Sequence, residues 1–247
     1  MNHNTQREVY GAFQLPYLKG LNASGSACAE GLNTSAAWLT ANFGNFSKYA
    51  AYQDLVSLNS RFHGLEMLSR LTVKQRAQLS ATLQSPEDVQ KLMRFVTTST
   101  VTEYIDELDR QFRRANVSLE GGVRATLLQH VLTAAQPIFQ RADDAEFLRW
   151  MGPRLAGLIS GLNSTHIPLV FDGLESRNCS VINAVVTVLN EAIPDFSNTT
   201  RQSIYRRILR VTAGTTHGAR KGFTKCFRCF DETRTFHLCP VARAPPT

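Results

Sequence analysis

Four side chains near the C-terminus have the types and spacing of zinc ligands. Cys226 and Cys229 form a Cys-x-x-Cys pair, followed by His237 and Cys239. Thiolates and imidazoles are the usual ligands of structural zinc, but such sites leave two or more residues within each pair, and the second pair here leaves one. Three interpretations therefore stay open for these residues: a zinc site, a local disulfide, or a tail that has no structure of its own.

A second kind of chemistry is encoded by acceptor sequences for N-linked sugars, Asn-x-Ser/Thr. The chain has 13 Asn, and about one residue in six is Ser or Thr, so chance predicts roughly two such sites. Seven are present: Asn22, Asn33, Asn45, Asn116, Asn163, Asn178 and Asn198. Because N-linked sugars are bulky, solubilising and confined to surface loops of secreted proteins, this density indicates an extracellular or cell-surface glycoprotein.

Two cysteines, Cys28 and Cys179, lie close to acceptor sites in the main part of the chain. In an oxidising compartment they are the candidate disulfide pair. The alternative is a pair of unpaired buried thiols. Five cysteines cannot all pair within one chain, so at least one is free, metal-bound or joined to another molecule.

Catalytic constellations are weak by comparison. The acids Asp106, Glu107 and Asp109 alternate with arginines at a spacing of four, which predicts ion pairs on a solvated helix face. A second acidic cluster, at 143–146, has the spacing of a helix cap. The six histidines are scattered, without a metalloprotease motif, a nucleophile elbow or a phosphate-binding glycine loop. We therefore predict no catalytic residue, no cofactor and no enzyme activity.

Several large side chains have a functional and a packing interpretation. Trp38, Phe43, Phe46 and Trp150 would form a binding patch if exposed, but their helical spacing favours the core. His130 lies among apolar residues at helical spacing, and we likewise expect it to serve in packing.

Composition and charge narrow the class of protein. At 247 residues and 43% hydrophobic, the chain is long and apolar enough for a core. The net charge of +7 is concentrated in residues 201–247, with ten basic and two acidic residues, whereas residues 1–200 carry 17 and 18. We therefore expect the main part to bind no nucleic acid. The sequence also has no apolar run long enough for a transmembrane segment.

The elements expected to position these residues are helices. Capping pairs mark helix starts at Thr72/Gln75, Thr100/Glu103, Asp143/Glu146 and Thr199/Gln202, and Ser85-Pro86 marks a fifth. Apolar residues recur at spacings of three and four, as in Ile182, Val185 and Leu189.

These patterns predict an all-α fold of stacked antiparallel helices, with about ten helices between Thr34 and Val211. Because no clean repeat period emerges, we expect an irregular superhelical, armadillo-like array. Three parts follow: a poorly ordered N-terminal segment (1–27), a helical glycoprotein module (28–212), and a basic, disordered Cys-containing tail (213–247).

A resemblance to known proteins covers about residues 25–212. The first matching element comprises Cys28, Asn33, Trp38-Leu39, Asn42-Phe43-Gly44 and Leu71-Thr72-x-x-Gln75. The second comprises Phe147, Trp150 and Asn178-Cys179-Ser180. The chain resembles a repeat unit of large extracellular glycoproteins of fish, and is distantly similar to the mesothelin, stereocilin and otoancorin superfamily. The resemblance implies a secreted or surface-attached helical protein with a role in adhesion or extracellular structure.

Together these observations predict a non-enzymatic, extracellular or cell-surface glycoprotein module that binds a protein or matrix partner or itself. The N-terminus has no apolar signal-peptide core, so we expect a fragment of a longer secreted chain or an incomplete gene model. The alternative is an intracellular helical adaptor whose basic Cys/His tail holds zinc and contacts nucleic acid, with its acceptor sites unused.

Overall fold

The computed structural model describes residues 2–23, 32–115, 118–174 and 177–212, and all regular structure in these ranges is helical. Between Ser35 and Thr212 they contain ten α-helices, α3 to α12, together with short 3₁₀ and π turns. The all-α prediction is therefore confirmed. The chain divides into two compact units, residues 1–123 and 124–247. The superhelical array stays a prediction.

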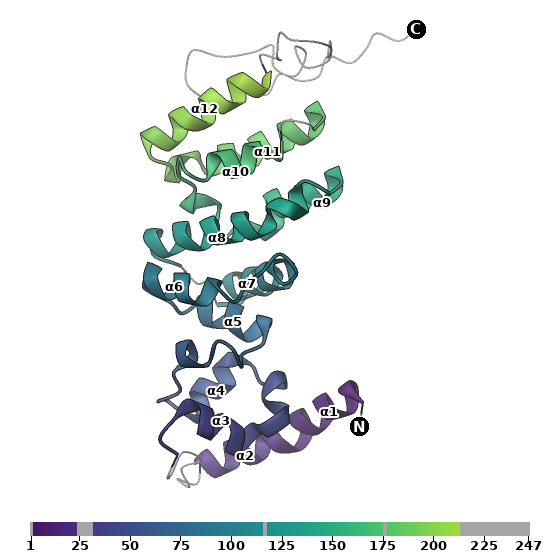
Figure 1. Ribbon diagram of the computed structural model, residues 1–247, viewed down its shortest axis with the longest axis vertical. Helices are drawn as coiled ribbons and strands as arrows, with labels where there is room; N and C mark the ends of the chain where they lie inside the picture. Colours follow the sequence, from purple (N-terminus) through teal and green to yellow (C-terminus); the bar gives the residue numbers. More distant parts are fainter. Residues whose placement is uncertain (1, 24–31, 116–117, 175–176, 213–247) are drawn as a thin grey trace. The chain divides into compact units, whose positions relative to one another are not determined.

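The first unit begins with a continuous helical rod that consists of α1, η1 and α2 (Figure 1). Later elements of this unit, η2 and α4, pack against the rod. In this unit α2 packs against α4, α4 against α5, and α5 against both α6 and α7. The bounds are α1 (His3–Val9), η1 (Tyr10–Gln14), α2 (Leu15–Ala23), α3 (Ser35–Phe43), η2 (Gly44–Tyr49), α4 (Tyr52–Leu58), η3 (Gly64–Met67), α5 (Val73–Ser80), α6 (Pro86–Met93) and α7 (Val101–Ala115).

Residues 3–23, which belong to the N-terminal segment defined from the sequence as 1–27, are helical. Asn2 caps the first turn through a hydrogen bond from the Thr5 amide to its side chain, at 2.9 Å. Tyr10 and Leu18 are both 4% exposed and anchor the rod on the unit. These two buried residues are eight positions apart, so they do not form a helical stripe that is recognisable in the sequence.

The second unit is a stack of short helices in which α11 packs on α9 and α10 packs on α12 (Figure 1). Its bounds are α8 (Gly121–Phe139), which spans the boundary of the two units, α9 (Asp144–Arg149), η4 (Trp150–Arg154), η5 (Ile159–Gly161), α10 (Ile167–Phe171), α11 (Cys179–Glu191), η6 (Ile193–Asp195) and α12 (Asn198–Thr212).

Each unit has an aromatic centre. Trp38 packs against Phe43 and Phe62 in the first, with ring centroids 5.4 and 5.6 Å apart. Trp150 and Phe139 lie 5.5 Å apart in the second. Both tryptophans have no exposed surface. Trp38, Phe43 and Trp150 are therefore core residues, as helical spacing favours, while Phe46 is half-buried.

Candidate functional site

The acceptor asparagines lie outside the core wherever the structure describes them. Five are exposed, Asn163 is half-buried, and Asn116 lies outside the described residues; the exposed ones are Asn22, Asn33, Asn45, Asn178 and Asn198. Their side chains differ in what they bind. Asn22 donates from Nδ2 to the Ser57 carbonyl over 3.4 Å, a long contact. For Asn45 and Asn198 the described residues provide no side-chain hydrogen bond of the acceptor amide.

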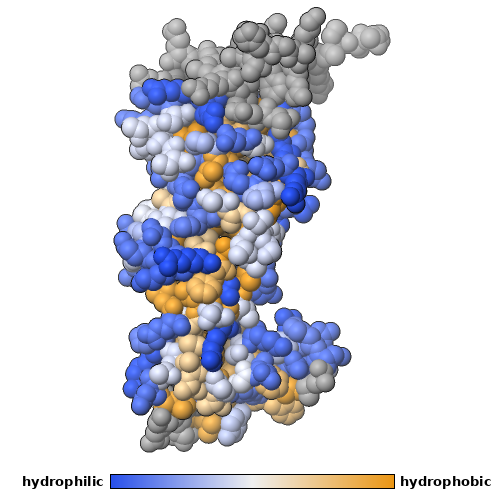
Figure 2. All heavy atoms as spheres, in the orientation of Figure 1, coloured by the Kyte–Doolittle hydropathy of each residue, from blue (hydrophilic) through white to orange (hydrophobic). Residues whose placement is uncertain are grey.

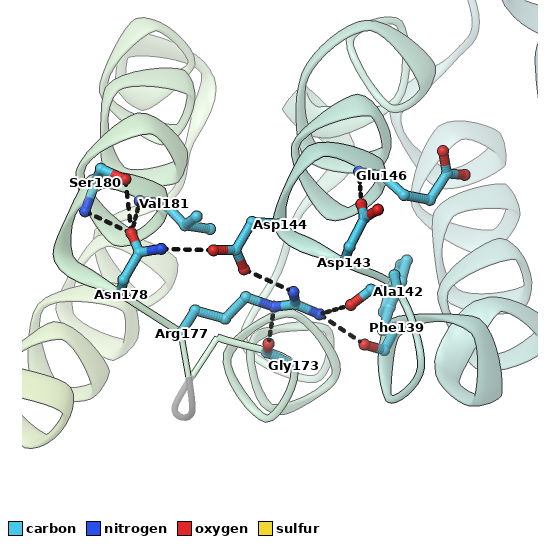
Figure 3. A network of polar contacts seen from close by, with 10 residues as sticks. All are labelled: Phe139, Ala142, Asp143, Asp144, Glu146, Gly173, Arg177, Asn178, Ser180 and Val181. Carbon is cyan, nitrogen blue, oxygen red and sulfur yellow. Dashed lines mark hydrogen bonds and ion pairs between the residues drawn. The ribbon is translucent and has the colours of Figure 1, made fainter.

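Asn178 is bonded through both ends of its amide (Figure 3). As the N-cap of α11, its Oδ1 accepts from the backbone amides of Ser180 and Val181, at 3.0 and 3.1 Å. The Ser180 hydroxyl donates to the same oxygen over 2.6 Å. On the other side, Nδ2 donates to the Asp144 carboxylate over 2.5 Å. The acceptor amide and the sequon hydroxyl are thus both used within the fold.

Asp144 is held in turn by Arg177, the residue that precedes this sequon (Figure 3). The Arg177 side chain is 9% exposed and forms an ion pair with Asp144 at 2.9 Å. It also donates to the carbonyls of Phe139 and Ala142 at 2.9 Å and of Gly173 at 3.1 Å. We call Asp144, Arg177 and Asn178 the α9–α11 junction.

The acceptors of Arg177 explain its position. The Phe139 and Ala142 carbonyls lie at and just beyond the end of α8, where helices leave carbonyl groups without intrahelical partners. A guanidinium, with several donors in a planar fork, bonds these carbonyls and a carboxylate together. The cation also lies over the Phe147 ring, 4.4 Å from its centroid. Arg177 therefore ties the end of α8, the start of α9 and the loop before α11.

In a second sequon, at Asn163, the asparagine side chain is also hydrogen-bonded, but to a different residue. Asn163 Oδ1 accepts from the Thr165 amide at 2.9 Å and from its hydroxyl at 2.6 Å. The Asn163 backbone amide donates to Nδ1 of His166, which is 1% exposed. Burial lowers the pKa of His166, and a hydrogen bond to the Gly161 carbonyl partly opposes that effect. This histidine is neutral and structural at neutral pH.

The acidic clusters have structural partners. Glu107 is buried, not solvated as expected: it pairs with Arg110 at 2.7 Å and accepts from Gln78 and Gln111. The predicted Asp109–Arg113 ion pair is present at 2.8 Å. Local spacing does not predict the burial of Glu107, because one of its two glutamine partners, Gln78, lies on another helix, α5.

The second acidic cluster serves helix α9. Asp143 caps it by accepting from the Glu146 amide at 2.7 Å, as the capping pattern predicts. Glu146 pairs with Arg154, whose guanidinium lies 5.1 Å from the Trp150 ring centroid. His130 is half-buried, and burial lowers its pKa.

The cysteine predictions fall largely outside the described residues. The possible zinc ligands Cys226, Cys229, His237 and Cys239 and the disulfide candidate Cys28 all lie there; Cys179 begins α11, but its side chain is not described. Within the described ranges, no group of three or more His, Cys, Asp or Glu side chains is placed to hold a metal.

Comparisons with known proteins add no family. A scan of family models found no match, and neither did searches for similar curated proteins and similar solved structures.

No helix among the described residues is both long and apolar enough to cross a membrane.

Proposed function

We propose that this chain is a non-enzymatic, N-glycosylated module of an extracellular or cell-surface protein, with a structural, adhesive or protein-binding role. The observation that carries the proposal is the position of the acceptors: each acceptor asparagine in the described residues is exposed or half-buried. Five of these six asparagines are exposed, so a sugar attached to them meets solvent.

The polar networks support the non-enzymatic part. Carboxylates of both acidic clusters and one buried histidine have structural partners: Glu107 bonds two glutamines and an arginine, Asp143 caps α9, and His166 accepts a hydrogen bond from a backbone amide within a turn. Catalytic groups need a free face toward a substrate. These groups instead use their polar atoms to hold helices together.

The partner surface follows from the sugars. Because a glycan excludes protein from its surroundings, the proposed protein or matrix contact is a face free of acceptors. Two large apolar side chains on the N-terminal rod, Phe13 and Tyr17, are 72% and 65% exposed and are candidates for that contact. Figure 2 shows apolar surface reaching the α1–α2 end of the first unit.

The distant relationship to the mesothelin superfamily is part of this proposal. Its support is local: Thr72 and Gln75, from the Leu-Thr-x-x-Gln element, form a capping box at the start of α5. A capped helix start is common among helical proteins, so the acceptor positions carry more weight.

Site-by-site glycan mapping tests the proposal. The chain is secreted from eukaryotic cells behind a supplied signal peptide, and each acceptor peptide is analysed by mass spectrometry after enzymatic sugar removal. We expect sugars at several of the seven asparagines. A secretion-competent chain that carries none, or a reduced intracellular chain with stoichiometric zinc, would favour the intracellular adaptor instead.

A further inference from the structure

The α9–α11 junction uses the same atoms that sugar transfer needs. In the transfer reaction, Nδ2 of asparagine bonds to the anomeric carbon of a lipid-pyrophosphate-linked oligosaccharide. The carbon–oxygen bond to the carrier breaks with its electron pair on the pyrophosphate, and Nδ2 loses one proton. The enzyme that catalyses this step therefore has to reach Nδ2 and the hydroxyl two residues later.

At Asn178 both groups are engaged in the folded chain. Nδ2 donates to Asp144 and the Ser180 hydroxyl donates to Asn178 Oδ1. Rotating the Asn178 side chain away also removes the N-cap of α11, a helix of 13 residues. Asp144 does not swing aside with it, because Arg177 holds that carboxylate from a position only 9% exposed.

Asn45 provides the contrast within the same chain. Asn45 is exposed, and the described residues give neither its amide nor the Ser47 hydroxyl a side-chain hydrogen bond. Modification of Asn45 therefore breaks no side-chain hydrogen bond among the described residues. Asn163 lies between these two cases in how far its sequon is hydrogen-bonded. The Thr165 hydroxyl donates to Asn163 Oδ1, but no carboxylate in the described ranges accepts from Nδ2 as Asp144 does at Asn178.

We infer that folding of the α9–α11 junction competes with sugar transfer at Asn178, so that Asp144 and Arg177 limit the fraction of this acceptor that is modified. The inference rests on the proposed function, since it requires the chain to meet the transferase. Local opening of the junction frees the groups that its hydrogen bonds engage, and each lost contact shifts that opening equilibrium.

The experiment compares one acceptor in several variants, which removes any effect of the sequon's own residues. The secreted wild-type chain and its Asp144→Ala variant are digested, and modified and unmodified Asn178 peptides are quantified by mass spectrometry. The matched control is Asp172→Ala, which removes another carboxylate paired with an arginine, Arg207, at 2.8 Å.

We expect partial modification of Asn178 in the wild type. In Asp144→Ala the ratio of modified to unmodified Asn178 should rise about fivefold, the factor that corresponds to losing one hydrogen bond of about 1 kcal/mol. Asp172→Ala should leave that ratio unchanged, and occupancy at Asn163 should stay constant in both variants.

Two results would overturn the inference: complete modification of Asn178 in the wild type, or an unchanged ratio in Asp144→Ala. A ratio that rises equally in Asp172→Ala, or together with occupancy at Asn163, would show a general folding defect and would also refute it. Failure of the proposed function looks different, since no acceptor would then carry sugar in any variant.

Discussion

Arg177 shows how one side chain replaces several ordinary helix caps. Its guanidinium bonds the Phe139, Ala142 and Gly173 carbonyls and the Asp144 carboxylate while covering the Phe147 ring. Carbonyls that are partly buried without donors are costly, so one cation that bonds three of them stabilises the fold more than an exposed ion pair does.

Replacing Arg177 should therefore destabilise the second unit strongly. We expect Arg177→Ala to lower the free energy of unfolding by about 2–3 kcal/mol, since charged hydrogen bonds are lost and carbonyls are left without donors. Urea unfolding measures the change. Arg207→Ala is the matched control, because its partner Asp172 is 56% exposed, and it should cost less than about 1 kcal/mol. Equal effects of the two substitutions would contradict this role for Arg177.

His166 makes stability depend on pH. The unfolded histidine takes up its proton near pH 6.5, whereas burial lowers the pKa of the folded one. Just below about pH 6.5 the unfolded state binds more protons, so the free energy of unfolding falls as the pH drops. His130 contributes in the same direction, because burial lowers its pKa as well.

We expect the urea midpoint to decrease from about pH 7.5 to about pH 5.5, and His166→Gln to flatten that slope. A His166→Gln slope as steep as the wild type would show that other groups cause the pH dependence.

For single residues, the sequence predicts which asparagine is an acceptor but not which side chain it contacts. Asn178 is recognisable as an acceptor from three consecutive letters, but its partner Asp144 lies 34 residues earlier. Nothing in the spacing predicts that contact, because it depends on α11 packing on α9. Glu107 was assigned to solvent for the same reason: two of its contacts lie within α7, but Gln78 comes from α5.

Helix starts were the most predictable elements. Capping is a local interaction, so Thr72 with Gln75, Ser85 with Pro86, and Asp143 are all found where the residue pattern puts them. The last start differs from the predicted Thr199/Gln202 pair. Helix α12 begins at Asn198, and its first turn is capped by Ser197, whose hydroxyl accepts from the Thr200 amide. Neighbouring hydroxyl residues make such a shift invisible in sequence.

Close packing of two elements is tested at Gly161, at the end of η5. A methyl group there would lie 3.0 Å from the Ala125 amide nitrogen and the Arg124 carbonyl carbon of α8. Because backbone atoms yield little, we expect Gly161→Ala to lower the free energy of unfolding by about 1–3 kcal/mol.

The matched control for that substitution is Gly152→Ala in η4, where a methyl group meets nothing within 4 Å. Its effect should stay within about 0.5 kcal/mol, and both variants are compared by urea unfolding. Indistinguishable midpoints for the two variants would contradict the close approach of η5 to α8.

At the level of the whole chain, the described residues have the predicted all-α fold class. Apolar residues at helical spacing were sufficient for the all-α assignment, since they recur in long, regular stripes such as Val123, Leu127 and Val131, all without exposed surface. The chain separates into two compact units with a boundary near the start of α8, a division that the sequence does not predict. That boundary depends on contacts distant in sequence, which single-sequence patterns do not contain.

The exposed aromatic pair tests whether surface and core were separated correctly. Phe13→Ser and Tyr17→Ser together should change the free energy of unfolding by less than about 1 kcal/mol, because both rings lie mainly in solvent. Trp38→Ala, which empties the centre of the first unit, should cost about 3–5 kcal/mol. Thermal and urea unfolding distinguish these outcomes, and a large loss in the double variant would place that pair in the core.

The proposal that the chain is an extracellular glycoprotein can be tested by measuring its intact mass. The chain is secreted behind a supplied signal peptide and weighed before and after enzymatic sugar removal, with thiols counted in parallel. We expect a large mass loss, from sugars on several asparagines, and at least one disulfide. An unmodified, fully reduced chain retained in the cell would contradict the proposal.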